Sequence, residues 1–217
     1  QTCASSDLFH DAEQACRAVS AIFQAGITPS GLEFMERRAI EYAMAYEGRE
    51  VLDLPEAVKA HLLIEVDGFH PDVLQKDCEH IFEVLERFDC GEILFADNDA
   101  QKKELWQLRR VTGHAVKRGS IYKEEDTVVP RAELATLLKG VKEIGNRYGF
   151  ESVCYGHAGD GNLHVNILKG NLSDQQWEEE IPKGIREIFQ LVKSLKGMLS
   201  GEHGVGYVQR RYMEDRK

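Results

Sequence analysis

Cys154-Tyr-Gly-His-Ala-Gly-Asp-Gly-Asn-Leu-His-Val-Asn-Ile-Leu168 is typical of two short strands joined by a tight turn. Asp160-Gly161 favours a two-residue type I′ turn, because both central positions need positive φ, which Gly adopts freely and Asp tolerates. This turn would place His157 opposite His164. Opposed residues of an antiparallel pair share one face with Cβ atoms about 4.5–5.5 Å apart, so the two imidazoles could bind one divalent metal. Asn166 points to the same face.

Helical and extended patterns alternate on the N-terminal side of this hairpin. Helices are predicted over 11–26, 30–46, 71–88, 97–118 and 130–149, and extended segments over 61–66, 92–96 and 121–129. This order predicts an α+β fold with ferredoxin-like split βαβ elements, in which helices cover one face of an antiparallel sheet. Residues 1–9 show no period and no apolar run, so the strand that should precede the first helix is predicted to be missing.

The C-terminal part begins with a capped helix and continues into a Gly-rich stretch. Ser173 and Gln176 resemble a capping box, and Pro182 is expected to kink or split the helix that follows. Four glycines fall within residues 197–206. No repeat or flexible linker divides the chain, so residues 1–217 are interpreted as one compact unit with two sub-regions. The missing strand suggests a fragment of a larger protein.

The composition argues against several classes of protein. A hydrophobic content of 42% is sufficient for a core, and the formal net charge of −10 argues against nucleic acid as a partner. The sequence contains neither an apolar run of about 18 residues nor a secretory signal, which favours a cytoplasmic location. Five cysteines without a CxxC pair are interpreted as reduced thiols rather than a disulfide scaffold or a zinc ribbon.

His157 and His164 are the best candidates for metal ligands. Two imidazoles supply half of a tetrahedral site, and Glu202 within Ser200-Gly-Glu-His-Gly204 would add a third ligand and leave one position open for substrate. The alternative is an ordinary hairpin with partly exposed histidines, followed by a Gly-rich loop that only turns the chain. Gly204-Val-Gly206 lacks the preceding strand and the third glycine of a nucleotide-binding loop.

Other charged residues carry no functional signal by themselves. Arg109 and Arg110 are predicted to lie on the solvated face of a helix, and Lys123 is equally unremarkable. Four further histidines are interpreted as structural or solvated: His61, His70, His80 and His114.

Two longer motifs carry a resemblance. Gly156-His-Ala-Gly-Asp-Gly-Asn-Leu-His164 and Ser200-Gly-Glu-His-Gly-Val-Gly206 resemble the signature stretches of the C-terminal domain of FAD-linked oxidases. That group includes the glycolate oxidase FAD-binding subunit, D-lactate dehydrogenases and D-2-hydroxyglutarate dehydrogenases. Residues 25–36, 105–110 and 127–131 resemble the family's pattern in the same order, so the resemblance covers most of the chain.

The resemblance implies a set of site residues. A divalent metal, often zinc, would be held by His157, His164 and Glu202; His203 would be the base; Arg109, Lys123 and Asn166 would contact substrate. The interval from Arg109 to Lys123 is one residue shorter than in the hydroxyglutarate enzymes, which leaves open whether Arg109, Arg110 or Thr112 reaches the substrate.

The resemblance also implies an activity. The family oxidises a D-2-hydroxy acid to the 2-oxo acid by hydride transfer to FAD, which is bound mainly by an N-terminal domain that this sequence lacks. The chain alone is therefore expected to be inactive. A quinone, a flavoprotein or an iron–sulfur partner would accept the electrons, and a homodimer is one option for assembly. Two other hypotheses are a stand-alone metal-dependent binding module and a hydrolase in which Glu202 or His203 activates a metal-bound water.

Overall fold

The strands form one continuous antiparallel sheet in the computed structural model, which describes residues 2–96, 98–207, 209, 210 and 212. Seven strands lie in the order β4-β1-β3-β2-β6-β7-β5. Their bounds are β1 (Thr2–Phe9), β2 (Gly31–Glu36), β3 (Ala60–Asp67), β4 (Cys90–Phe95), β5 (Tyr122–Val128), β6 (Glu151–Gly156) and β7 (Asn162–Leu168). Every paired neighbour is antiparallel, which confirms the α+β class.

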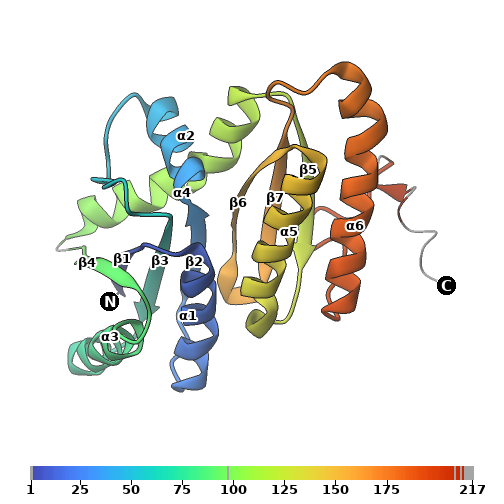
Figure 1. The fold of residues 1–217 in the computed structure, drawn as a ribbon. Coiled ribbons are helices and arrows are strands. Elements are labelled where there is room, and N and C mark those ends of the chain that lie inside the picture. Colours follow the sequence, from blue (N-terminus) through green and yellow to red (C-terminus); the bar gives the residue numbers. More distant parts are fainter. Residues whose placement is uncertain (1, 97, 208, 211, 213–217) are drawn as a thin grey trace.

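Helices cover both faces of this sheet, not one face as predicted. They are α1 (Ala12–Gln24), α2 (Arg37–Glu47), α3 (Pro71–Leu85), α4 (Asp99–Gly119), α5 (Leu134–Tyr148) and α6 (Ile181–Ser194). Apolar residues of α1, α3, α5 and α6 form one core, and those of α2 and α4 form a second core on the other face. Figure 1 shows α5 in front of the strands and α6 to the right of it.

The order of the strands confirms the split βαβ elements. The β1-α1-β2 unit has β3 between its two strands, and β3-α3-β4 has β1 between them. A third unit, β5-α5-β6, has β7 between its strands. The two halves of the sheet meet where β2 pairs with β6, through Phe34↔Gly156 and Met35↔Tyr155. The candidate site lies beside this seam.

The strand predicted to be missing is present as β1. It is a central strand, and its polar residues are buried rather than alternating with apolar ones. The Ser5 hydroxyl donates to Asp7 at 3.0 Å, and the Ser6 hydroxyl lies 2.7 Å from His61 Nε2 on β3. These hydrogen bonds partly compensate the burial of the polar residues that leave 1–9 without an apolar run.

The second predicted helix begins seven residues later than expected. Residues 31–36 form β2, and α2 starts only at Arg37. Leu32 and Met35 lie at helical spacing, but they occupy opposite faces of a strand. Met35 belongs to the core under α2 and α4, whereas Leu32 belongs to the other core. This correction is important for the site. Residues two apart on a strand lie on the same face, so Glu33 is on the face of Met35.

Local capping signals located several other helix ends correctly. The Asp11 carboxylate accepts the backbone N–H of Glu13 and Gln14 at 2.7 and 3.2 Å. Asn98 caps α4 in the same way, while Asp97 lies outside the described residues. Gly149 ends α5 with a left-handed φ of 74°.

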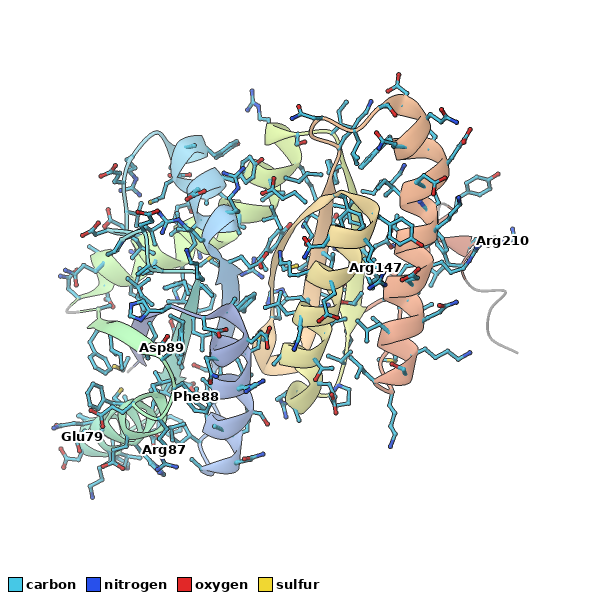
Figure 2. The ribbon with its side chains drawn as sticks, viewed as in Figure 1. Glu79, Arg87, Phe88, Asp89, Arg147 and Arg210 are labelled. Atoms are coloured by element: carbon cyan, nitrogen blue, oxygen red, sulfur yellow. The ribbon has the colours of Figure 1, made fainter. Side chains whose placement is uncertain are left out.

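The C-terminal helix changes from a π-helical to an α-helical pattern just before its proline, without a break in the helix. A π-helical turn spans Gln176–Glu180, and Pro182 lies in the first turn of α6. Arg147 of α5 pairs with Glu187 of α6, and Figure 2 shows Arg147 between these two helices. Among the described residues, no helix combines the length and the apolar character needed to cross a bilayer.

Asp7 gives the fold a specific pH dependence. Burial raises the pKa of Asp7 to about 7, above the value of about 3.9 expected when it is unfolded. Its contribution to stability is therefore complete below about pH 4 and is lost as the pH rises through 7. We predict that Asp7→Asn raises the free energy of unfolding at pH 8 by roughly 2–4 kcal/mol and has little effect at pH 4.

Urea unfolding at pH 4 and pH 8 measures this difference. Asp53→Asn, at an exposed position, is the control. Its free energy of unfolding at each pH should be close to that of the unmodified protein. An equal gain or loss for Asp7→Asn at both pH values would contradict the prediction.

Candidate functional site

The predicted hairpin forms with a different turn and register. β6 ends at Gly156, a 3₁₀ turn spans Ala158–Asp160, and Gly161 alone takes a positive φ of 75°. Tyr155, not His157, is therefore the partner of His164. The register is shifted by two residues, an even number, so His164 keeps its predicted face. A Cβ atom at Gly161 would lie 2.0 Å from the Val129 carbonyl oxygen, so this position requires glycine.

His157 still reaches the neighbourhood of His164 from the first position of the loop. One possible ligand atom each from His157, His164 and Glu202 lies within 4.8 Å of the other two. His157 Nε2 is 3.3 Å from Glu202 Oε1, and its Nδ1 is 2.8 Å from Glu33 Oε1. The hydrogen bond to Glu33 raises the pKa of His157 despite partial burial. The structure therefore brings together the three residues assigned to a metal.

His164 lies at the centre of the cluster. Burial lowers its pKa, which favours the neutral imidazole that metals bind. Its Nδ1 is buried and, within the described part of the chain, has no hydrogen-bond partner; the nearest carboxylates, Glu124 and Asp126, are 3.8 Å away. The His203 ring is 5.5 Å from the His164 ring, between centroids. Glu124, His164 and His203 form a second group of ligand atoms within 4.8 Å.

Asp126 fixes the Gly-rich loop over this cluster. Its Oδ2 accepts the backbone N–H groups of Gly201, Glu202 and His203 at 2.9, 2.7 and 3.0 Å. Its Oδ1 accepts the Asn162 amide at 2.7 Å. Burial raises the pKa of Asp126, but the hydrogen bonds outweigh burial and hold the pKa at about 2. Asp126 is thus ionised at neutral pH and holds the backbone of Glu202 and His203 in place.

We predict that Asp126→Ala frees the loop and weakens metal binding about 10–100-fold, as the loss of outer partners of metal ligands does. The variant leaves three backbone N–H groups without their acceptor. Hydrogen exchange at 201–203 should accelerate, and metal titration should show the weaker affinity. Asp126→Asn, which keeps one oxygen acceptor, should be intermediate. Asp174→Asn, at an exposed site, should change neither quantity, and unchanged exchange in Asp126→Ala would contradict the assignment.

Arg109 is buried, so its predicted position on a solvated face is wrong. Its Nε donates to Glu33 Oε2 at 2.8 Å, and Glu33 also bonds His157. The guanidinium lies 5.5 Å from the centroid of the Tyr155 ring. Its Nη2 is buried and has no hydrogen-bond partner among the residues that the structure describes. An unpartnered buried donor is costly, so this atom is suited to an anionic ligand.

The structure also separates the three alternatives on α4. Arg110 is exposed. The Thr112 hydroxyl is buried and donates to the Leu108 carbonyl at 2.9 Å, within its own helix. Arg109 is therefore the one of the three that presents a buried, unpartnered donor beside the cluster.

Asn166 lies on the same face as His164. The residue is fully buried. Its amide nitrogen and oxygen have no close hydrogen-bond partner in the described part of the molecule, and the amide interacts with the Tyr155 phenol. It is paired in register with Glu124 of β5. Burial, followed by the charge of Glu124, raises the pKa of neighbouring Tyr155 to about 12, so the phenol stays protonated. Asn166 can therefore donate and accept toward a small polar ligand.

Lys123 does not join these residues. Successive residues of β5 face opposite sides of the sheet, and Lys123 is paired with Ile167 while Glu124 is paired with Asn166. The Lys123 ammonium donates to the Trp177 carbonyl at 2.9 Å and lies 4.2 Å from the centroid of its ring. The acid Glu124, not the base Lys123, thus faces the site.

Sequence reasoning missed four residues of the site. They are Glu33, Glu124, Asp126 and Tyr155. Glu33 was placed in a helix, and the acidic run over 124–126 gave no sign of which face each residue takes. Glu33 lies within residues 25–36, which were matched to the family by resemblance, and Asp126 directly precedes another such segment, residues 127–131.

Fold and site together define a class of protein. An antiparallel sheet with helices on both faces carries a cluster of histidines and carboxylates next to a buried arginine and a buried amide with unpartnered donors. This is an α+β domain with a candidate site for a small anionic ligand on one face of its sheet.

The family is shown by a match over nearly the whole chain. Residues 4–217 match the family described as FAD linked oxidases, C-terminal domain. The chain belongs to this family, which confirms the resemblance.

Two curated relatives illustrate its range. The glycolate oxidase subunit GlcD of Bacillus subtilis (strain 168) is 31% identical over 210 residues, which are 95% of this chain and 43% of that protein. A D-lactate dehydrogenase of Anaerostipes hadrus is 27% identical over 212 residues, 95% of this chain and 44% of that protein. The chain thus spans less than half the length of these relatives.

A solved structure shares the fold. p-Cresol methylhydroxylase with substrate bound superimposes with a TM-score of 0.63 over 92% of this chain and 44% of that chain, at 9% sequence identity. At this identity the likeness extends to the fold alone.

Proposed function

We propose that this chain is the substrate- and metal-binding domain of a flavin-dependent oxidoreductase that converts a D-2-hydroxy acid to the 2-oxo acid. The observation that carries the proposal is the meeting of His157, His164 and Glu202 beside the unpartnered Nη2 of Arg109. The named relatives, a glycolate oxidase subunit and a D-lactate dehydrogenase, support the substrate class.

The cluster fits a divalent metal, with zinc as the first choice. Two imidazoles and one carboxylate are a known ligand set for catalytic zinc, with a further position for substrate. Glu33 would act as the outer partner that orients His157 and leaves Nε2 for the metal. The unpartnered Nδ1 of buried His164 is a second fitting feature. A bound divalent ion would supply Lewis-acid stabilisation of negative charge on the substrate hydroxyl oxygen.

Arg109 and Asn166 would bind the substrate carboxylate. The Arg109 guanidinium is already oriented by Glu33, so little side-chain freedom is lost when Nη2 donates to the carboxylate. The amide of Asn166, on β7, would supply a second donor, which is neutral. Lys123, on the other face, is not included in the proposed site.

His203 would accept the proton of the substrate hydroxyl. Its backbone is fixed by Asp126, and its ring lies next to His164 at the edge of the cluster. A histidine is suited to this task because its imidazole can take up and release a proton. Flavin, when bound, would accept the hydride, and this chemistry belongs to the cofactor.

The rest of the protein completes the proposal. A flavin-binding domain would be supplied outside residues 1–217, so these residues alone would not turn over. A quinone, a flavoprotein or an iron–sulfur protein would reoxidise the flavin, in the cytoplasm. A homodimer is the simplest assembly to test by mass measurement in solution.

Anaerobic flavin reduction tests the proposed function. The full-length protein should bind FAD and bleach on addition of a D-2-hydroxy acid, but not of its L enantiomer. Removal of metal with a chelator should slow bleaching, and zinc should restore it. A full-length protein that binds no flavin, or that hydrolyses esters with added zinc instead, would contradict the proposal.

A further inference from the structure

Glu124 lies beside the candidate cluster. It faces Asn166 across the β5–β7 pair and so shares a face with His164. One carboxylate oxygen, Oε1, is 3.8 Å from His164 Nδ1. The side chain is 14% exposed, and it raises the pKa of Tyr155 through its charge. Glu124 is therefore part of the wall of the site.

The cation nearest to Glu124 is already engaged. Lys117 of α4 places its ammonium 2.7 Å from the other carboxylate oxygen, Oε2. Lys117 thus binds one carboxylate oxygen, Oε2, whereas His164 lies nearest to the other, Oε1. Lys123 is on the opposite face of the sheet. Neither lysine thus presents a free charge to a ligand held between Arg109 and His164.

The charges of the site suit a substrate with one carboxylate. Arg109 presents one unpartnered donor, Nη2, and its charge acts on both His157 and His164. Four carboxylates surround the same space: Glu33, Glu124, Asp126 and Glu202. A second carboxylate on a short substrate would approach Glu124 while the cationic groups of the proposed site, Arg109 and the metal ion, are engaged by the first carboxylate and the hydroxyl oxygen, so the repulsion between like charges would remain.

We propose that Glu124 is a specificity-determining residue that restricts the site to monocarboxylic 2-hydroxy acids and rejects dicarboxylic ones. The inference rests on the proposed function and names its substrate class. Substrates of the glycolate or lactate type, with an uncharged substituent, fit this charge pattern, whereas hydroxyglutarate-type substrates do not.

Substrate selectivity of the full-length flavoprotein tests this inference. D-lactate and D-2-hydroxyglutarate are compared by kcat/KM in the original protein and in Glu124→Gln, which keeps the size of the side chain and removes its charge. The original should prefer D-lactate. In Glu124→Gln the ratio for D-2-hydroxyglutarate over D-lactate should rise at least about tenfold, because the repulsion disappears and the Lys117 ammonium is released.

A second variant separates these two causes. The double variant Glu124→Gln with Lys117→Met also removes the released ammonium. Its kcat/KM ratio for D-2-hydroxyglutarate over D-lactate should therefore lie between those of the original protein and Glu124→Gln. Glu151→Gln is the matched control, because Glu151 is an exposed acid at the far end of β6 whose charge is paired with Arg38. It should leave the ratio unchanged.

Metal content distinguishes this role from a competing one. Glu124 also belongs to the group of ligand atoms formed with His164 and His203. Glu124→Gln should keep the metal content of the original, and a loss of metal would overturn the inference by making Glu124 a ligand. An original protein that prefers D-2-hydroxyglutarate would overturn it as well. A protein that oxidises neither acid would instead contradict the proposed function.

Discussion

Replacing His164 with alanine is expected to remove the bound metal and to lower turnover by more than about 100-fold. Losses of 10–100-fold follow when only an outer partner of a metal ligand is changed, so loss of a direct ligand should exceed them. His164 is shared by both groups of ligand atoms, so no other described cluster of this kind can replace it. The measurements are metal content of the purified protein and kcat with a D-2-hydroxy acid.

The control for this prediction is another histidine. His10 lies at the end of β1, pairs with Asp89 and is partly exposed, so His10→Ala should retain metal and turnover. Because His164 is buried, its variant also needs a check of folding by circular dichroism. His164→Gln provides a second variant of more similar size. Full metal content in a folded His164 variant would contradict the metal assignment.

Replacing Arg109 with alanine is expected to raise KM for the hydroxy acid by more than about 100-fold, since a charge-assisted hydrogen bond to the carboxylate would be lost in a buried site. It should also destabilise the domain by about 3–5 kcal/mol, because Glu33 would be left as a buried carboxylate without its cation. Steady-state kinetics and urea unfolding measure the two effects separately.

Two further variants make this test specific. Arg109→Lys keeps the charge beside Glu33 but not the planar fork, so it should restore more stability than substrate affinity. Arg110→Ala changes the adjacent, exposed arginine and should affect neither property. An unchanged KM in Arg109→Ala would show that the carboxylate is bound elsewhere.

Several structural features were predictable because their causes are local. Asp11, Asn98 and Gly149 mark helix ends through hydrogen bonds or a backbone conformation that involve their immediate neighbours. The metal candidates His157 and His164 lie seven residues apart around a Gly-rich turn. Even with the wrong turn type, they remain close, because the loop is short.

Two strands were missed because their polar residues are satisfied by distant partners. Ser6 of β1 meets His61, 55 positions away. Glu33 of β2 meets Arg109 and His157, 76 and 124 positions away. In a single sequence such residues interrupt an apolar pattern. The hydrogen bonds and ion pairs that allow them to be buried form only when the segments pack together.

The sequence by itself determined the class of fold, most of the helices and the residues of the candidate metal cluster, His157, His164 and Glu202. Tertiary structure decided which polar residues face that cluster. Side chains alternate along a strand, and the pairing of β5 with β7 gives Glu124 the face of the site and Lys123 the opposite one. Packing of α4 over β2 likewise buried Arg109 against Glu33. These choices depend on contacts between segments far apart in the chain, which no local pattern encodes.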